Sequence, residues 1–329
     1  FFFKTSFLRI KSFKNLIFLL FFIKNIYLEK IFHEIFKHKN YKCCYVDYDI
    51  LMPSYIYWAL KRLNIKVFSY QERFNLGFST KRIAVFCDHY FVNNPYQIKH
   101  LSKSSFITAK TFQQVGQVKS EFINNLRLKV KKKKKTITIF GFDVPKNKYY
   151  AFHDPLMNWK NQKNFLQDIL KISNQFKKYN FIIRFKSLTW LIDNRYFDNE
   201  VKEINKTKNI IISNEYSHAK AYKICANSSL IISRWSSIMD EAYCAGIPVI
   251  MYNYYGLSKN IIKKYFDYGN NINSNNLDEL IFLIKKKISN NNIKKLDNNF
   301  SKKLYGKVNN NKNYTKNIIR NELYSFINK

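Results

Sequence analysis

Short apolar runs alternate along the chain with longer segments in which apolar residues recur every three or four positions. In the first half the extended runs are CCYVDY, IKVFSY and RIAVFCDHYFV. Helical spacing covers Phe18 to Lys37 and the segment PSYIYWALKRLN, in which Pro53 stands where a helix begins. Strands separated by helices of about a dozen residues indicate βαβ units and a parallel sheet.

A second series of the same kind follows a run of five lysines, Lys131 to Lys135. Its expected strands are TITIFGFD, NFIIRFK, NIIISN, SLIISR and PVIMYN, and its expected helices are NQKNFLQDILKISNQFKKY, AYKICAN, SSIMDEAYCAG and NNLDELIFLIKKKI. Because like charges repel and do not pack, we interpret the lysine run as an exposed linker. The pattern predicts an α/β protein with two Rossmann-like, doubly wound parallel-sheet domains.

The length of 329 residues suits two domains of ordinary size. We predict an N-terminal domain at 1–130, whose first strand would lie upstream, a linker at 131–135, a C-terminal domain at 136–300, and a basic, Asn-rich tail at 301–329 for which a helix is one interpretation. Two such domains would enclose a cleft at the carboxyl ends of their strands, the edge where open α/β sheets bind ligands.

The formal net charge is +35, from 57 basic and 22 acidic residues. Only nine of the basic residues are Arg, and the chain is rich in other residues with A/T-rich codons, so we attribute much of the Lys excess to genome composition. A nucleic-acid binder would be expected to use more Arg for bidentate contacts, and we do not expect nucleic acid as a partner. An attraction for phosphorylated molecules or anionic lipid remains.

The five cysteines form no CxxC pair, and no His accompanies them at zinc-finger spacing. We therefore expect a reduced, cytoplasmic protein without a zinc site. The uninterrupted apolar run Leu16 to Ile23 is shorter than the ~20 residues that span a bilayer, and no signal-peptide cleavage site follows it. We expect the first helix of a domain core, with a basic interfacial helix on the inner face of the plasma membrane as the alternative.

The segment IISRWSSIMDEAYCAGIPVIMYNY concentrates polar residues between two apolar strands. Arg234, Ser236 and Ser237 follow the first strand directly and precede a helix, whose free N–H groups favour an anion such as phosphate. Glu241 lies one turn beyond Ser237 on the same face, within reach of a sugar hydroxyl. A capping box from Ser237 to Asp240 would explain the same residues without a ligand.

The serine pair, the acid one turn later and the Gly-x-Pro before an apolar strand resemble the donor-binding region of GT-B glycosyltransferases that build bacterial surface and capsular polysaccharides. The segment is also similar to that of polysialyltransferase-like and polyglycerolphosphate-transferase-like enzymes. The resemblance implies two Rossmann-like domains facing across a cleft, with the nucleotide donor bound to the second. It also carries over Gly141 and Asp143 from ITIFGFD, and Arg184 and Lys186 from FIIRFKS, as donor-binding candidates.

In the first half, YIYWALKRLNIKVFSYQERF, FCDHYFVNN and VGQVKSEFI resemble the acceptor half of surface-carbohydrate biosynthesis proteins. Glycosyl transfer needs a base for the acceptor hydroxyl. The candidates are Glu72 in SYQERF, His89 beside Asp88, and His153 in FHDP; an ion pair, a structural His and a turn are their respective alternatives.

Asp47 and Asp49 have the spacing of an Asp-x-Asp metal motif but follow a buried strand, so we expect acceptor binding or solvation there and no metal. The resemblance implies a metal-independent glycosyltransferase without a cofactor, which moves a sugar from a nucleotide-sugar donor to a polysaccharide or lipid-linked glycan. The alternatives are a CDP-polyol phosphotransferase, a nucleotide-sugar epimerase of the same fold, and a non-enzymatic nucleic-acid or membrane-surface binder.

Overall fold

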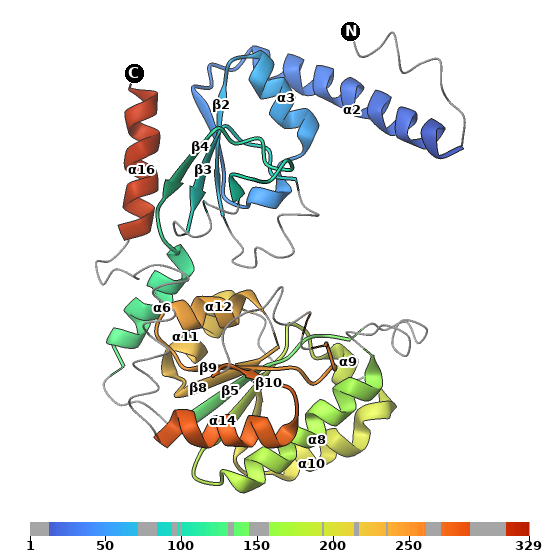
Figure 1. Cartoon of the computed structure of the whole chain (residues 1–329), viewed down its shortest axis with the longest axis vertical. Coiled ribbons are helices and arrows are strands. Elements are labelled where there is room, and N and C mark those ends of the chain that lie inside the picture. Colours follow the sequence, from blue (N-terminus) through green and yellow to red (C-terminus); the bar gives the residue numbers. More distant parts are fainter. Residues whose placement is uncertain are drawn as a thin grey trace. The chain divides into compact units, whose positions relative to one another are not determined.

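The computed structural model describes residues 13–71, 84–93, 98, 101–130, 135–144, 158–192, 194–213, 217–234, 236–258, 260, 271–289 and 314–328. The chain divides into two compact units, each built on a parallel sheet (Figure 1). Unit 1 comprises Phe1–Val115 and Ile319–Lys329, and unit 2 comprises Gly116–Ile318. Two α/β units with parallel sheets confirm the predicted fold class.

The sheet of unit 1 has the strand order β1-β2-β3-β4, and every adjacent pair is parallel. Its strands are β1 (Cys43–Val46), β2 (Lys66–Tyr70), β3 (His89–Val92) and β4 (Thr111–Gln114). Its helical elements are α2 (Phe13–Lys37), the 3-10 turn η1 (Asp49–Leu51), α3 (Ser54–Arg62) and most of α16 (Tyr314–Ile327). Helices α3 and α16 lie on opposite sides of this sheet (Figure 1).

Helix α3 begins directly after Pro53, whose ring suits the start of a helix because it lacks an N–H group. Its apolar face buries Tyr57, Ala59 and Leu60. Asn64 follows the helix with a φ of 57°, a left-handed conformation that Asn tolerates better than most residues, and this turn leads the chain into β2. The predicted helix and strand on either side of this turn are therefore confirmed.

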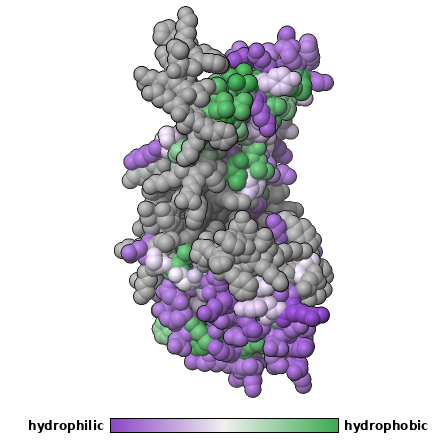
Figure 2. Space-filling model, turned by 90° about the vertical axis from the view of Figure 1, so that its right-hand side faces the viewer, coloured by the Kyte–Doolittle hydropathy of each residue, from purple (hydrophilic) through white to green (hydrophobic). Residues whose placement is uncertain are grey.

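Helix α2 differs from the core helix that we expected. Its second half packs on α3, where Phe32 stacks on Tyr55 and Glu29 pairs with Arg62 at 2.7 Å. Its first half, including Phe18, is exposed. Figure 2 views the molecule from the right-hand side of Figure 1, the side toward which this half of α2 extends, and shows apolar surface there. In the described part of the chain no helix has both the length and the apolar content needed to cross a bilayer.

The sheet of unit 2 has the order β10-β9-β8-β5-β6-β7, again with parallel pairs throughout. Its strands are β5 (Thr136–Phe140), β6 (Asn180–Arg184), β7 (Ile210–Ser213), β8 (Leu230–Ser233), β9 (Val249–Tyr252) and β10 (Asn273–Ser274). Its helical elements are α6 (Val118–Leu128), α8 (Trp159–Gln175), α9 (Thr189–Ile192), the 3-10 turn η2 (Arg195–Phe197), α10 (Asp198–Lys206), α11 (His218–Asn227), α12 (Ser237–Cys244) and α14 (Leu277–Ser289).

Helices cover both faces of this second sheet (Figure 1). Helices α8, α10 and α14 lie on one face, and α11 and α12, with α6 packed on them, lie on the other. The strands β5, β6, β8 and β9 are almost entirely buried because both of their faces are covered. This is the doubly wound arrangement that the alternating pattern predicted.

The division between the units differs from the predicted linker at Lys131–Lys135. The chain leaves unit 1 at Gly116, and α6 belongs to unit 2 because it packs on α11 and α12. Gly116 has a φ of +97°, and a side chain there would meet Thr315 Oγ1 at 2.8 Å. The tail does contain a helix, α16, which returns to unit 1.

Candidate functional site

The topology of unit 2 marks one position at the carboxyl edge of its sheet. From β5 the chain proceeds to β6 and β7 on one side, and β8, β9 and β10 follow on the other side of β5. Adjacent strands whose connections lead in opposite directions leave a crevice beyond their carboxyl ends, and ligands of open α/β sheets bind there. In unit 2 this crevice lies between the ends of β5 and β8.

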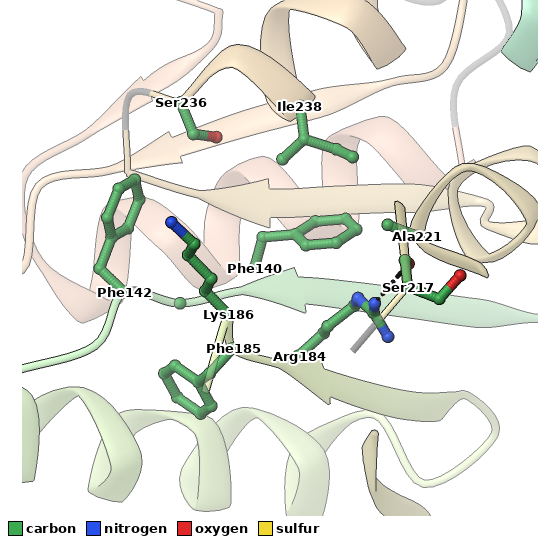
Figure 3. Close-up of a pocket in the computed structure, with 10 residues that line it drawn as sticks. Phe140, Phe142, Arg184, Phe185, Lys186, Ser217, Ala221, Ser236 and Ile238 are labelled. Carbon is green, nitrogen blue, oxygen red and sulfur yellow. Dashed lines mark hydrogen bonds between the residues drawn. The ribbon is translucent and has the colours of Figure 1, made fainter. Parts of the chain in front are cut away.

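A pocket lies beside that position, where the end of β5 meets the end of β6 and the start of α12 (Figure 3). It is lined by Phe140, Gly141, Phe142, Arg184, Phe185, Lys186, Ser217, Ala221, Ser236 and Ile238. These residues come from the ends of β5 and β6, the start of α11 and the start of α12. Four of the predicted donor-binding residues, namely Gly141, Arg184, Lys186 and Ser236, therefore meet in one place.

Arg184 and Lys186 supply the positive charge of the pocket. Arg184 is 7% exposed, and its guanidinium donates to Ser213 Oγ at 2.9 Å and to the Ser217 carbonyl at 2.8 Å. Lys186 is exposed, and its amine points toward the side of the pocket formed by Phe142 and Ser236 (Figure 3). Lys186 is thus the cation of the pair that a bound anion can reach from solvent.

Ser236 connects the start of α12 to the sheet. It is the N-cap residue, and its Oγ accepts from the Met239 N–H at 3.4 Å and lies 3.1 Å from Ser233 Oγ. Ser233 in turn donates to the Phe140 carbonyl at 2.9 Å. These contacts fix the start of α12 beside the end of β5, so the free N–H groups of the helix border the pocket.

The capping box that we considered, with Ser237 as the cap and Asp240 as its partner, is wrong, because α12 begins one residue earlier than such a box requires. The cap is Ser236, and Ser237 is the half-buried first residue of α12. The sequence left the choice open because both serines precede the same apolar run. Whether Ser237 contacts a donor stays a prediction.

Ser236→Ala should lower the free energy of unfolding by about 1 kcal/mol, because it removes the side-chain acceptor of the first turn. Ser237→Ala, which leaves the cap intact, should change it by less than about 0.5 kcal/mol. Thermal unfolding of both variants measures the difference. An equal loss in both would contradict the assignment of Ser236 as the cap.

Arg234 and Asp143 support the pocket from outside its lining. Arg234 is 2% exposed, and its guanidinium carbon lies 3.5 Å from the centre of the Phe142 ring, a cation–π contact that holds the ring against the pocket. The Asp143 carboxylate accepts from the Ser187 N–H at 3.0 Å and so joins the segments that follow β5 and β6.

Glu241 faces α6. It is 2% exposed, and its Oε1 lies 3.5 Å from Lys119 Nζ. Its backbone carbonyl accepts from Ser120 Oγ at 2.8 Å. Glu241 does not line the pocket of Figure 3, so the predicted contact with a sugar hydroxyl stays a prediction.

Of the three candidate bases, Glu72 and His153 lie outside the described residues. His89 belongs to the expected extended run RIAVFCDHYFV, and in the structure it is the first residue of β3, so it lies at the amino end of that strand. Val85 forms only an isolated bridge with Ile107. The apolar run RIAVF did not reveal this, because its alternation continues without a break into β3.

The ring of His89 is held between strands. Its Nδ1 lies 2.8 Å from Thr111 Oγ1 and its Nε2 lies 3.1 Å from Gln113 Oε1, both on β4. Burial lowers the pKa of His89; the Gln113 hydrogen bond opposes that shift. Both ring nitrogens therefore have partners within the protein, as in a structural histidine.

The pKa of His89 predicts an acid-dependent loss of stability. Because the folded-state pKa is below the ordinary value of about 6.5, the unfolded chain binds the proton more readily, and stability falls as the pH drops below that value. His89→Gln should remove part of this loss. Urea unfolding of wild type and variant at pH 7.5 and 5.5 measures it, and identical pH dependence would contradict the assignment.

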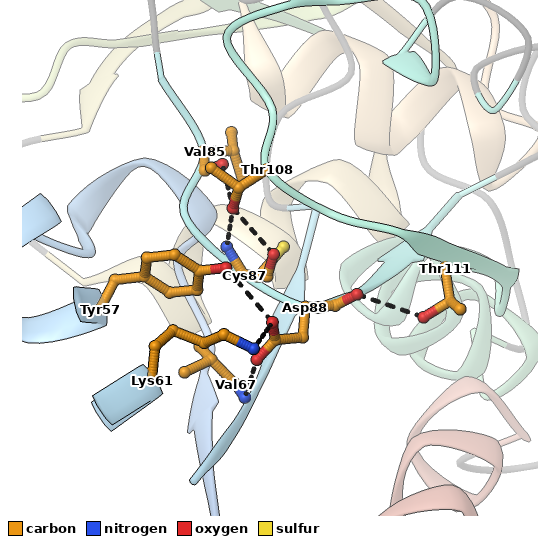
Figure 4. Close-up of polar contacts among 8 residues, drawn as sticks. All are labelled: Tyr57, Lys61, Val67, Val85, Cys87, Asp88, Thr108 and Thr111. Atoms are coloured by element: carbon orange, nitrogen blue, oxygen red, sulfur yellow. Dashed lines mark hydrogen bonds and ion pairs between the residues drawn. The ribbon is translucent and has the colours of Figure 1, made fainter. Parts of the chain in front are cut away.

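The neighbouring Asp88 has a structural role in unit 1 (Figure 4). Its carboxylate accepts from Lys61 Nζ at 2.7 Å, from the Val67 N–H at 2.9 Å and from the Tyr57 hydroxyl at 3.2 Å. It therefore ties α3 to the start of β2.

Neither carboxylate of the Asp-x-Asp spacing belongs to a metal site within the described ranges, where no cluster of three or more ligating side chains occurs. Asp49 is buried and accepts from the Tyr90 hydroxyl and the Ile50 N–H. Asp47 is exposed.

Sequence reasoning missed the part of the pocket that Phe142, Ser217 and Ile238 form. Ser217 caps α11, with its Oγ accepting from the Lys220 N–H at 3.4 Å. A serine between the run NIIIS and the helix AYKICAN was the available signal. Phe142 and Ile238 gave no signal of their own, because exposed and pocket-lining apolar residues look alike in a sequence.

The fold resembles those of solved UDP-N-acetylglucosamine 2-epimerases and of MurG. A UDP-N-acetylglucosamine 2-epimerase gives a TM-score of 0.62 at 12% identity, covering 93% of this chain and 78% of that one. The UDP-GlcNAc 2-epimerase of Neisseria meningitidis, bound to UDP-GlcNAc, gives 0.61 at 14% identity, covering 91% and 81%. MurG of Acinetobacter baumannii gives 0.51 at 12% identity, covering 91% and 78%.

No protein-family model matches the sequence, and no curated protein matches it significantly. At identities this low the structural likeness establishes the fold, which is of the GT-B type that the resemblance implied. The narrower polysialyltransferase-like family stays a prediction.

Proposed function

We propose that this chain is an enzyme that uses a nucleotide-activated sugar and transfers that sugar to a growing surface polysaccharide or glycolipid. The observation that carries the proposal is the pocket at the carboxyl ends of β5 and β6, beside the start of α12. It joins Arg184, Lys186 and Ser236 to the start of a helix, and none of its described lining residues bears a carboxylate. Such a pocket suits the phosphates of a nucleotide donor.

In this reaction the bond between the sugar and the diphosphate breaks, and negative charge grows on the leaving phosphate. The Lys186 amine, the Ser236 hydroxyl and the N–H groups at the start of α12 are the groups that would stabilise it. Arg184 adds positive charge from beneath the pocket, although Ser213 and Ser217 already accept from its guanidinium. With these groups the proposed transfer needs no metal.

The acceptor side is less specified. Transfer needs a base for the acceptor hydroxyl, and Glu72 and His153 are the candidates that we carry forward. His89 is the weaker candidate because Thr111 and Gln113 engage its ring nitrogens. Glu241 would accept from the ribose or sugar hydroxyls if α12 presents it to the donor.

A nucleotide-sugar epimerase is the second candidate. The two epimerase structures give TM-scores of 0.62 and 0.61, against 0.51 for MurG. An epimerase also cleaves or activates its nucleotide sugar, so the same phosphate pocket would serve it. It differs in needing no acceptor and in exchanging a proton on the sugar ring with solvent.

Two measurements test the proposal and separate the candidates. Calorimetric titration with UDP, CDP and CMP should show saturable binding of at least one nucleotide; binding of none would contradict both candidates. Incubation with UDP-GlcNAc in deuterated water, without an acceptor, should leave the sugar ring unlabelled. Deuterium at carbon 2 would instead establish the epimerase and overturn the transferase.

A further inference from the structure

The first half of helix α2 exposes apolar side chains on all sides. Phe18 is 73% exposed, Phe21 65% and Leu20 58%. The other exposed apolar residues of this segment are Leu16, Ile17, Phe22 and Ile23. Consecutive residues of a helix are separated by about 100°, so these side chains surround the helix instead of forming one stripe.

A helix that is apolar on all sides is normally buried. The second half of α2 packs on α3, whereas the N-terminal end of the helix extends beyond α3 (Figure 1). This end of the helix therefore has the surface of a segment that enters an apolar medium.

A groove between α2 and α3 continues this surface onto the body of unit 1. It is lined by Phe21, Phe22, Asn25, Ile26, Glu29, Ser54, Tyr55, Trp58 and Arg62. Trp58 is 49% exposed on α3. Figure 2, which looks from the side toward which α2 points in Figure 1, shows apolar surface gathered on this face.

The charge of the surrounding sequence identifies the partner. Residues 1–28 contain no Asp or Glu and five basic residues, Lys4, Arg9, Lys11, Lys14 and Lys24. An apolar segment with basic neighbours and an exposed Trp suits the boundary between anionic headgroups and acyl chains. Pairing with a second copy would bring the same positive charges together, which opposes self-association through this face.

We propose that Leu16–Ile23 and Trp58 form a docking surface for an anionic lipid bilayer. The eight residues span about 12 Å as a helix, which suits insertion into one interface and not passage across the bilayer. The inference holds whichever reaction unit 2 performs, and it specifies the surface that would bring the enzyme to a lipid-linked acceptor.

The test uses the full chain and two kinds of vesicle, one of phosphatidylcholine and one of equal parts phosphatidylcholine and phosphatidylglycerol. Co-sedimentation should show binding to the anionic vesicles and much weaker binding to the neutral ones. The double variant Phe18→Ser, Phe21→Ser should bind the anionic vesicles at least about tenfold more weakly than the wild type, because two large side chains no longer enter the acyl region. Both side chains are exposed, so the melting temperature should not change.

The matched control is Ile211→Ser, Phe282→Ser in unit 2, where the two side chains are 58% and 61% exposed. It should bind as the wild type does. Brominated lipids should quench the tryptophan fluorescence of the wild type, and Trp58→Phe should lose that quenching. The proposal would be overturned if both double variants lost the same vesicle affinity, or if the wild type bound both kinds of vesicle equally. It would also be overturned if the wild type were a dimer in solution that Phe18→Ser, Phe21→Ser converted to a monomer.

Discussion

Lys186→Ala should weaken nucleotide binding about tenfold or more. A hydrogen bond to a charged group contributes about 1.5 to 3 kcal/mol, and each 1.4 kcal/mol corresponds to about a factor of ten in affinity. Lys186 is exposed at the edge of the pocket, so its removal should leave the fold unchanged. Calorimetric titration with the nucleotide that binds wild type best measures the change.

The matched control is Lys171→Ala on α8, where the side chain is 63% exposed and away from the pocket lining. It removes the same charge from the same unit and should leave the affinity within twofold. A similar loss in both variants would mean that Lys186 acts only through the overall charge. An unchanged affinity in Lys186→Ala would show that the nucleotide phosphates bind elsewhere.

Gly141→Ala should destabilise unit 2 by about 1 to 3 kcal/mol. A Cβ atom at Gly141 would lie 1.9 Å from a carbon of the Phe185 ring, a distance that neither atom can tolerate. Phe185 is 5% exposed and belongs to the core, so the ring cannot simply turn into solvent. Chemical denaturation of the variant and wild type gives the change in unfolding free energy.

The second variant Phe185→Leu tests the cause of that loss. Alone it should destabilise the protein, because it shortens a buried side chain. The double variant Gly141→Ala, Phe185→Leu should lose less unfolding free energy than the sum of the losses in the two single variants. Strict additivity would show that Gly141 is required for another reason, such as close approach of a ligand. Nucleotide affinity of Gly141→Ala, measured in the folded fraction, separates that alternative.

The sequence was sufficient for the strands and helices whose apolar pattern is uninterrupted. Strands β5, β6, β8 and β9 are buried on both faces and therefore appear as continuous apolar runs, which places the pocket residues at their ends. Strand β4 escaped prediction because Thr111–Gln114 is polar and half-exposed.

Other parts of the site depend on contacts that no local pattern records. Glu241 was placed by helical spacing alone, and the spacing could not show that Lys119 and Ser120 of α6 occupy its surroundings. The boundary between the units was placed at the lysines for their charge, whereas it falls at Gly116 because α6 packs on α11 and α12. Long-range packing decided both outcomes.

The return of α16 to unit 1 has a consequence for how the protein forms during translation. Phe326 of α16 packs edge-on against Phe68 at 5.4 Å between ring centres, and Lys66 lies 4.9 Å from the Phe326 ring. Helix α16 leaves the ribosome after all the strands of unit 2, so unit 2 can complete its core while the β2 face of unit 1 still awaits this helix. The first unit to be synthesised is then the last to mature, and nascent chains stalled before Tyr314 should carry a protease-resistant unit 2 beside a protease-sensitive unit 1.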